Sequence, residues 1–120
     1  MKKILIVDDE PNIVMALEYT FKKSNYEVFI ARDGQEALDI LKTNFPDVII
    51  LDIMMPMVDG FATLEQIRSD ANLQHTKVMF LSAKNKKSDI EKGLALGADA
   101  YMTKPFSIKK VVEKVEELLG

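Results

Sequence analysis

Charged or hydroxyl side chains stand directly behind four apolar runs of this chain. In chain order they are Asp8, Asp9, Asp52, Ser82 and Lys104. Apolar runs of this kind are typical of buried parallel strands, and in an open α/β sheet the ligand site lies outside the carboxyl ends of the strands. We therefore expect three carboxylates, one hydroxyl and one ammonium to meet in one crevice, which suits a hard divalent cation and a phosphoryl group.

Electrostatics favours the same grouping. Three carboxylates in one crevice repel one another, and this repulsion raises the pKa of at least one of them. A divalent cation and the ammonium of Lys104 are the compensating charges that this sequence offers. Mg²⁺ prefers oxygen ligands in octahedral geometry, so the sequence indicates a magnesium site.

Strand and helix patterns alternate along the chain. The expected strands are 4–7, 26–31, 47–51, 77–81 and 99–103. Three expected helices are 11–24, 88–96 and 107–119. Two more are expected from Gly34 until Phe45-Pro46 breaks the helix, and from Gly60 through Arg68. Such alternation implies right-handed crossovers and a parallel sheet with helices on both faces. We expect one α/β domain over residues 1–120.

Composition excludes several classes of function. Hydrophobic content of 48% and charged content of 29% are ordinary for a soluble protein, and a net charge of −3 argues against nucleic-acid binding by this domain. The absence of cysteine excludes disulfides and thiolate ligands. The first apolar run stops at Asp8, too early for a signal peptide, and nothing resembles a membrane span. We expect a cytoplasmic protein with no membrane partner.

Some of these residues also have plainer interpretations. Asp8 and Asp9 are acceptable helix-capping acids, and Asp59 with Gly60 reads as a turn followed by a helix start. His75 lies among polar residues and is expected to be a solvated loop residue. Three methionines close to Asp52 are expected to be adaptable packing rather than side-chain ligands, namely Met54, Met55 and Met57.

Four motifs together resemble the receiver domain of two-component response regulators. They are Val7-Asp8-Asp9-Glu10, the segment Leu51 to Gly60, Leu81-Ser82-Ala83 and Lys104-Pro105-Phe106. Each motif is weak alone, but their order at matching strand ends makes the set specific, and the likeness covers essentially all 120 residues. It implies a (βα)5 doubly wound fold with a five-stranded parallel sheet in the order 2-1-3-4-5. In this family the Lys104-Pro105 bond is commonly cis.

The resemblance makes Asp52 the phosphoacceptor. Its carboxylate attacks the phosphorus of a histidine phosphoramidate on a sensor histidine kinase or phosphotransfer protein, or of a small acyl phosphate. Ser82 donates a hydrogen bond to one phosphoryl oxygen and Lys104 pairs with another. The domain is then a signalling switch in a phosphorelay, and catalyses only its own phosphorylation and dephosphorylation rather than turning over a substrate.

The resemblance also implies the metal ligands. Asp9 and Asp52 ligate Mg²⁺ directly, Asp8 mainly holds a metal-bound water, and Met54 contributes its backbone carbonyl. Mn²⁺ can substitute for Mg²⁺. The cation offsets charge on the transferring phosphoryl group, which is most of what such a transfer needs from a protein.

Phosphorylation in this family is transmitted through a residue pair. The hydroxyl at Ser82 moves toward the phosphoryl group and Tyr101 turns inward, which alters the surface formed by the helix at 88–96, the strand at 99–103 and the helix at 107–119. We expect that surface to form a homodimer or, as the alternative, to contact a separate target protein.

Three rival classes of protein fit the sequence less well. A haloacid-dehalogenase-like phosphohydrolase uses a second Asp two residues after the nucleophile, where this chain has Met54, and usually carries a cap domain. A flavodoxin-like electron carrier needs a hydroxyl-rich phosphate loop after its first strand, where Asp8 and Asp9 would repel a phosphate. A pseudo-receiver, which only binds a partner, is disfavoured because every expected site residue is present.

Overall fold

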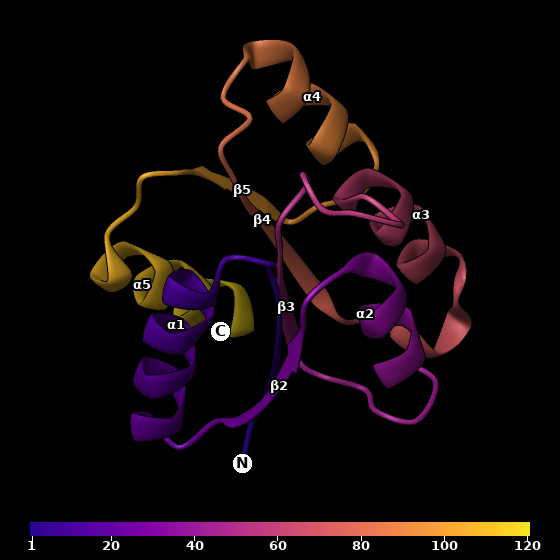
Figure 1. The fold of residues 1–120 in the computed structure, drawn as a ribbon. Coiled ribbons are helices and arrows are strands. Elements are labelled where there is room, and N and C mark those ends of the chain that lie inside the picture. The colour runs from indigo at the N-terminus through magenta and orange to yellow at the C-terminus, as the bar shows by residue number, and fades with distance from the viewer.

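Five strands and five helices alternate along the chain in the computed structural model, which describes residues 1–120 (Figure 1). The elements are β1 (Lys3–Val7), α1 (Pro11–Lys23), β2 (Glu27–Ala31), α2 (Gly34–Ile40), β3 (Val48–Leu51), α3 (Gly60–Ser69), β4 (Lys77–Ser82), α4 (Lys87–Ala95), β5 (Ala100–Thr103) and α5 (Ile108–Leu119). A short 3-10 turn at Ala71–Leu73 was not predicted. The predicted alternation is confirmed, and the Lys104-Pro105 bond is cis.

The sheet is parallel throughout and its strand order is β2-β1-β3-β4-β5, as the resemblance implied. β1 and β3 are neighbours although a helix, a strand and a second helix separate them in sequence, and Val7 pairs with Leu51 at their ends. The chain turns to opposite sides of the sheet after these two strands, so the crevice expected for a ligand opens between them. Asp8 and Asp52 are the next residues after that pair.

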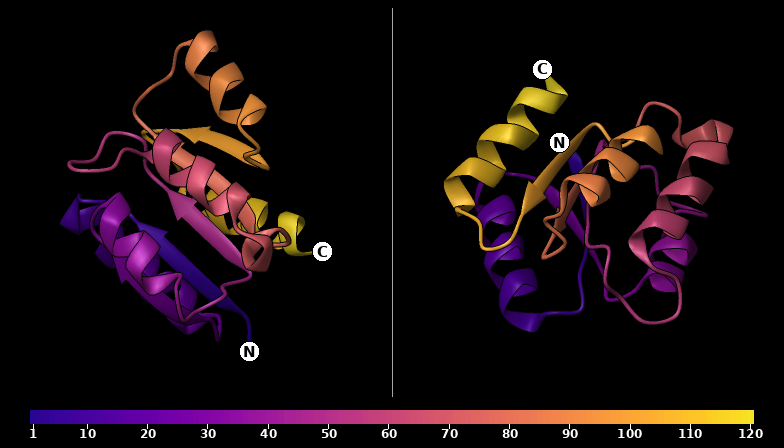
Figure 2. Two further views of the ribbon diagram at one scale, coloured as in Figure 1. Left: turned by 90° about the vertical axis from the view of Figure 1, so that its right-hand side faces the viewer. Right: turned by 90° about the horizontal axis from the view of Figure 1, so that it is seen from above.

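Side chains of the strands alternate between two cores. Leu5 and Val7 belong to a core under α2 and α3, while Ile4 and Ile6 belong to a core under α1 and α5. Figure 2 shows the helices on both faces of the twisted sheet. Because β1 is buried on both faces, all four of these side chains are 0% exposed, which explains why the strand reads as a continuous apolar run.

Side chains cap the starts of three of the five helices, whereas α1 and α4 start without a side-chain cap. The Asp59 carboxylate accepts from the Ala62 backbone N–H at 2.8 Å, which confirms the interpretation of Asp59 and Gly60 as a helix start. α1 differs, because its N-cap residue is Glu10 and no side chain caps it. Asp8 and Asp9 therefore do not cap this helix, and the plain interpretation of these two acids is wrong.

α2 ends earlier than predicted. We expected this helix to continue until Phe45-Pro46 breaks it, but its last residue is Ile40. The Asn44 side chain donates to the Ile40 carbonyl oxygen at 3.0 Å. The same carbonyl also accepts the Asn44 backbone N–H at 3.1 Å, and the N–H groups of Lys42 and Thr43 donate to carbonyls three residues back at 3.3 Å. The backbone therefore tightens into turns after Ile40 instead of continuing as a helix to the proline.

Candidate functional site

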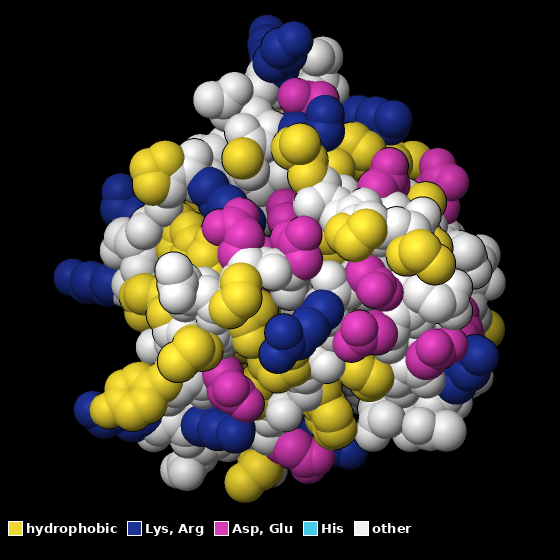
Figure 3. Space-filling view, in the orientation of Figure 1, with side chains coloured by type: hydrophobic (Ala, Val, Ile, Leu, Met, Phe, Trp, Pro, Cys, Tyr) yellow, Lys and Arg dark blue, Asp and Glu magenta, His cyan; other side chains and the backbone are white.

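Four of the five chemistry-bearing residues predicted from the sequence meet at the carboxyl edge of the sheet. Asp8 and Asp52 are 2% and 4% exposed and follow β1 and β3, and Ser82 ends β4 and is 0% exposed. Lys104 follows β5 and reaches back across the sheet edge. Figure 3 shows acidic side chains gathered near the middle of this face, over the ends of the strands. The site is thus a buried carboxylate pair with one lysine beside it.

The Lys104 ammonium lies among three carboxylates. Its Nζ is 2.9 Å from Oε1 of Glu10, 3.0 Å from Oδ2 of Asp8 and 3.6 Å from Oδ2 of Asp52. The other oxygens of the two aspartates are held by backbone donors, since Ile53 N–H donates to Asp52 Oδ1 at 2.8 Å and Glu10 N–H to Asp8 Oδ1 at 2.9 Å. The Oδ2 atoms of both aspartates therefore face the lysine.

Glu10 was missed by the sequence analysis, and the structure brings its carboxylate close to those of Asp8 and Asp52. Carboxylate oxygens of Asp8, Glu10 and Asp52 lie within 4.8 Å of one another, a grouping that could hold a metal ion. Asp9 is exposed and lies outside this group. The only signal in the sequence was that Glu10 is the third acidic residue in a row. A metal role for Asp9, and for the Met54 carbonyl, stays a prediction.

Burial and mutual repulsion perturb the two aspartates. Burial raises the pKa of Asp52, and the charge of Asp8 raises it further, against the opposing effects of Lys104, the Ile53 N–H and the Ser82 hydroxyl. Burial also raises the pKa of Asp8, although the Glu10 N–H and Lys104 oppose it. The repulsion predicted from the sequence is therefore present, and a cation bound here would relieve it.

The pKa of Lys104 is also raised, but for a different reason. Burial alone would lower the pKa of Lys104, but hydrogen bonds to Glu10 and Asp8 and the charge of Asp52 outweigh burial, so the pKa is raised above its ordinary value. Lys104 therefore stays protonated at neutral pH. It offers a fixed positive charge, which suits contact with a phosphoryl oxygen.

Ser82 and Tyr101 are joined through one backbone residue. The Lys84 N–H donates to Ser82 Oγ at 3.3 Å, and the Tyr101 hydroxyl donates to the Lys84 carbonyl oxygen at 2.6 Å. The Tyr101 ring packs on Phe80 with centroids 5.7 Å apart. A Cβ on Gly93 would lie 3.1 Å from that ring, so α4 packs closely on it. The Tyr101 ring is thus half-buried between β4 and α4, and its part in a switch stays a prediction.

The three methionines after the acceptor differ from the expectation that all of them pack. Met55 is half-buried against the core under α3, but Met54 and Met57 are 58% and 83% exposed. Met57 also has φ of 70°, a left-handed conformation that is uncommon for a residue other than glycine. The packing interpretation therefore holds for Met55 and is wrong for the other two. His75 is exposed, as predicted.

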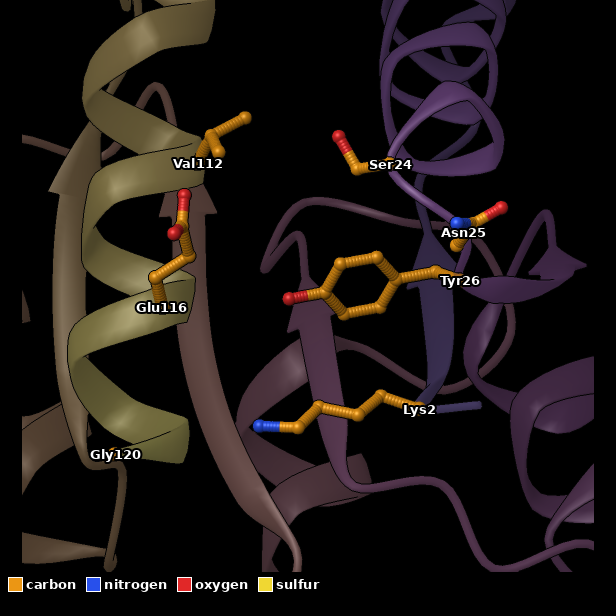
Figure 4. A pocket seen from close by; sticks show the side chains of 7 residues that line it. All are labelled: Lys2, Ser24, Asn25, Tyr26, Val112, Glu116 and Gly120. Atoms are coloured by element: carbon orange, nitrogen blue, oxygen red, sulfur yellow. The ribbon is translucent and has the colours of Figure 1, made fainter.

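A separate cavity of about 390 Å³ lies at the opposite edge of the sheet (Figure 4). Tyr26 precedes β2, Lys2 precedes β1, and Glu116 lies near the end of α5. These side chains are at the amino ends of the strands, far along the sheet from Asp52, so this cavity is not part of the candidate site. No helix of the structure is long and apolar enough to cross a membrane.

Comparisons with known proteins agree with this geometry. A family model described as the response regulator receiver domain matches residues 4–116. The alkaline phosphatase synthesis transcriptional regulatory protein PhoP of Bacillus subtilis (strain 168) is 45% identical over 118 residues, which are 98% of this chain and 48% of PhoP. The chain thus spans about half the length of that relative.

Solved structures show the same similarity. The chemotaxis response regulator CheY4 of Vibrio cholerae has a TM-score of 0.93 and 31% identity, with 99% of each chain covered. The receiver domain of the Francisella response regulator 1452 has a TM-score of 0.91 and 36% identity, with 99% of this chain and 97% of that one covered.

Proposed function

Because this chain belongs to the response regulator receiver domain family, we propose that it is a phosphorylation-dependent switch whose phosphoacceptor is Asp52. The phosphoryl group comes from a sensor histidine kinase or a phosphotransfer protein in the cytoplasm. The observation that carries this proposal is that Asp52, 4% exposed, faces both Lys104 and a second buried carboxylate at the sheet edge. Holding the like charges of Asp8 and Asp52 close together lowers the stability of the fold, which is typical of a functional site.

The geometry suggests which atom reacts. Oδ1 of Asp52 accepts the Ile53 N–H at 2.8 Å, so Oδ2, on the lysine side, is the freer nucleophile. It forms a bond to phosphorus while the bond from phosphorus to the histidine nitrogen breaks, and the imidazole takes up a proton as it leaves. The product is an acyl phosphate on Asp52. Lys104 offsets the charge of one phosphoryl oxygen and the Ser82 hydroxyl donates to another.

The donor set fits Mg²⁺, with Mn²⁺ as a substitute. Buried carboxylates that lie within 4.8 Å of one another offer the oxygen ligands that this ion prefers. Asp8, Asp9, Asp52 and the Met54 carbonyl are the residues that would hold it. When bound, the ion supplies charge neutralisation at the transferring phosphoryl group.

Acetyl phosphate tests the proposal against a turnover enzyme. In the presence of Mg²⁺, a receiver takes up one phosphoryl group and keeps it as a slowly decaying acyl phosphate. A phosphohydrolase would instead release phosphate rapidly without accumulating the adduct. Intact-protein mass and phosphate release, followed together, decide between the two, and rapid release would sink the receiver proposal. With chelator added, neither adduct nor release is expected.

Met54 should set the lifetime of the phosphorylated state. Hydrolysis needs a water in line with the acyl phosphate, and a thioether is only a weak hydrogen-bond acceptor. The Met54 side chain is 58% exposed beside the acceptor, so a polar group there has room to orient a water. Met54→Asn and Met54→Asp are expected to shorten the half-life several-fold in a decay assay. Met57→Asn, in the same loop and 83% exposed, is the matched control and should leave the half-life unchanged.

We further propose that α4, β5 and α5 form the output surface, used for a homodimer or for a separate target. Tyr101 lies in β5, and its hydroxyl contact with Lys84 joins that strand to the loop before α4. Phosphorylation adds close to two negative charges near Ser82, which should change the Lys84 contacts. Hydrogen exchange with and without beryllofluoride should show altered protection at 84–106. Changes confined to the loops around Asp52 would contradict this route.

A further inference from the structure

Glu10 makes a contact that the proposed function does not use. Its Oε1 accepts from the Lys104 ammonium at 2.9 Å, across 94 residues of sequence. The Glu10 side chain is 56% exposed and the Lys104 side chain is 10% exposed. The pair therefore joins the start of α1, at the solvent edge of the site, to the buried lysine.

This contact places the ammonium away from the acceptor. Lys104 Nζ is closer to Glu10 (2.9 Å) and Asp8 (3.0 Å) than to Asp52 (3.6 Å). An ammonium has three N–H donors, and two of its three carboxylate neighbours belong to the segment between β1 and α1. Lys104 is thus drawn toward that segment, while a phosphoryl group on Asp52 would require it to face the acceptor.

We propose that Glu10 is a positioning residue that holds Lys104 on the α1 side of the site and releases it when a phosphoryl group occupies Asp52. The inference rests on the proposed function. An interaction that exists in one state and is lost in the other shifts the equilibrium toward the first. Glu10 therefore opposes the phosphorylated state, and its contact with Lys104 sets how tightly a phosphoryl group, or a mimic of one, is held.

Beryllofluoride binding measures this effect. The titration follows backbone amide shifts at a Mg²⁺ concentration that saturates each variant, so that changes in metal affinity do not enter. Glu10→Gln removes the charge and keeps the length of the side chain. Glu10→Asp keeps the charge but is one methylene too short to maintain the contact. Both variants are expected to bind beryllofluoride about two- to five-fold more tightly than the parent, the range for a partly exposed ion pair.

Any result other than tighter binding by both variants overturns the inference. Tighter binding by Glu10→Gln alone would assign the effect to the charge of Glu10 rather than to its contact with Lys104. Unchanged binding in both variants would mean that the contact is kept in both states, and weaker binding would make Glu10 a supporting ligand of the site. Glu18→Gln is the matched control, because Glu18 lies on the same helix and pairs with Lys22 at 3.0 Å. If the parent itself fails to bind beryllofluoride, the proposed function fails, and the inference fails with it.

Discussion

The substitution Gly60→Ala is expected to abolish phosphorylation. It should also destabilise the domain by roughly 1–3 kcal/mol or more, the range for overpacking a tight site. A Cβ at this position would lie 2.3 Å from the Asp52 carbonyl oxygen and 2.7 Å from the Ile53 Cα. Both atoms belong to the backbone, so no side-chain rotation relieves the clash. The Gly60 N–H also donates to the Ile53 carbonyl at 2.9 Å, and displacing this turn would move the acceptor itself.

Urea unfolding and acetyl phosphate labelling check this prediction together. Gly120→Ala is the matched control, because nothing lies within 4 Å of a Cβ at Gly120 and this last residue can leave its φ of 85° without displacing a neighbour, so it should behave as the parent does. If Gly60→Ala proved as stable and as readily labelled as the parent, the close approach of α3 to Asp52 would not be a constraint on the site.

The substitution Arg68→Ala is expected to lower the free energy of unfolding by about 3 kcal/mol, since a hydrogen bond of a charged group contributes about 1.5–3 kcal/mol. Its guanidinium donates to the Gly97 carbonyl at 3.0 Å, the Thr76 carbonyl at 2.8 Å and the Asp99 carboxylate at 2.9 Å. Arg68 therefore joins the end of α3 to the start of β4 and to the turn between α4 and β5. Urea unfolding measures the loss.

Two further variants sharpen the Arg68 test. Arg68→Lys should recover only part of the stability, because a point charge cannot make the forked contacts of a guanidinium. Lys42→Ala removes an exposed ion pair with Asp39 and should cost about 1 kcal/mol or less. A loss at Arg68→Ala no greater than that at Lys42→Ala would show that the three contacts do not support the fold.

The positions of site residues at the ends of strands could be predicted best from the sequence. Apolar runs as continuous as Ile4 to Val7 form only where both faces of a strand are buried, so the residues behind them, Asp8 and Asp52, could be placed at one edge of a parallel sheet. The order of the strands came from the resemblance, because nothing in the runs themselves says which strands are neighbours. α2 ended early because the backbone after Ile40 tightens into turns with bonds to carbonyls three residues back, a local change that the periodic pattern does not record.

The proximity of Glu10 to Lys104 was missed for a different reason. Three acids in succession follow β1, and which of them points into the site depends on the backbone of the turn between β1 and α1. That turn is fixed by tertiary contacts, including those of Lys104 with Asp8 and Glu10. The exposure of Met54 and Met57 was missed for the same reason, because composition alone does not give the direction of a loop side chain.

Labelling of Asp52→Asn tests the central claim most directly. The parent and the variant are incubated with acetyl phosphate and Mg²⁺, and the phosphoryl content of each is measured by intact-protein mass. Asparagine keeps the shape of the side chain but lacks the nucleophilic carboxylate, and the other residues of the site are untouched. The proposed function predicts one phosphoryl group on the parent and none on the variant. Equal labelling of the two would show that Asp52 is not the phosphoacceptor.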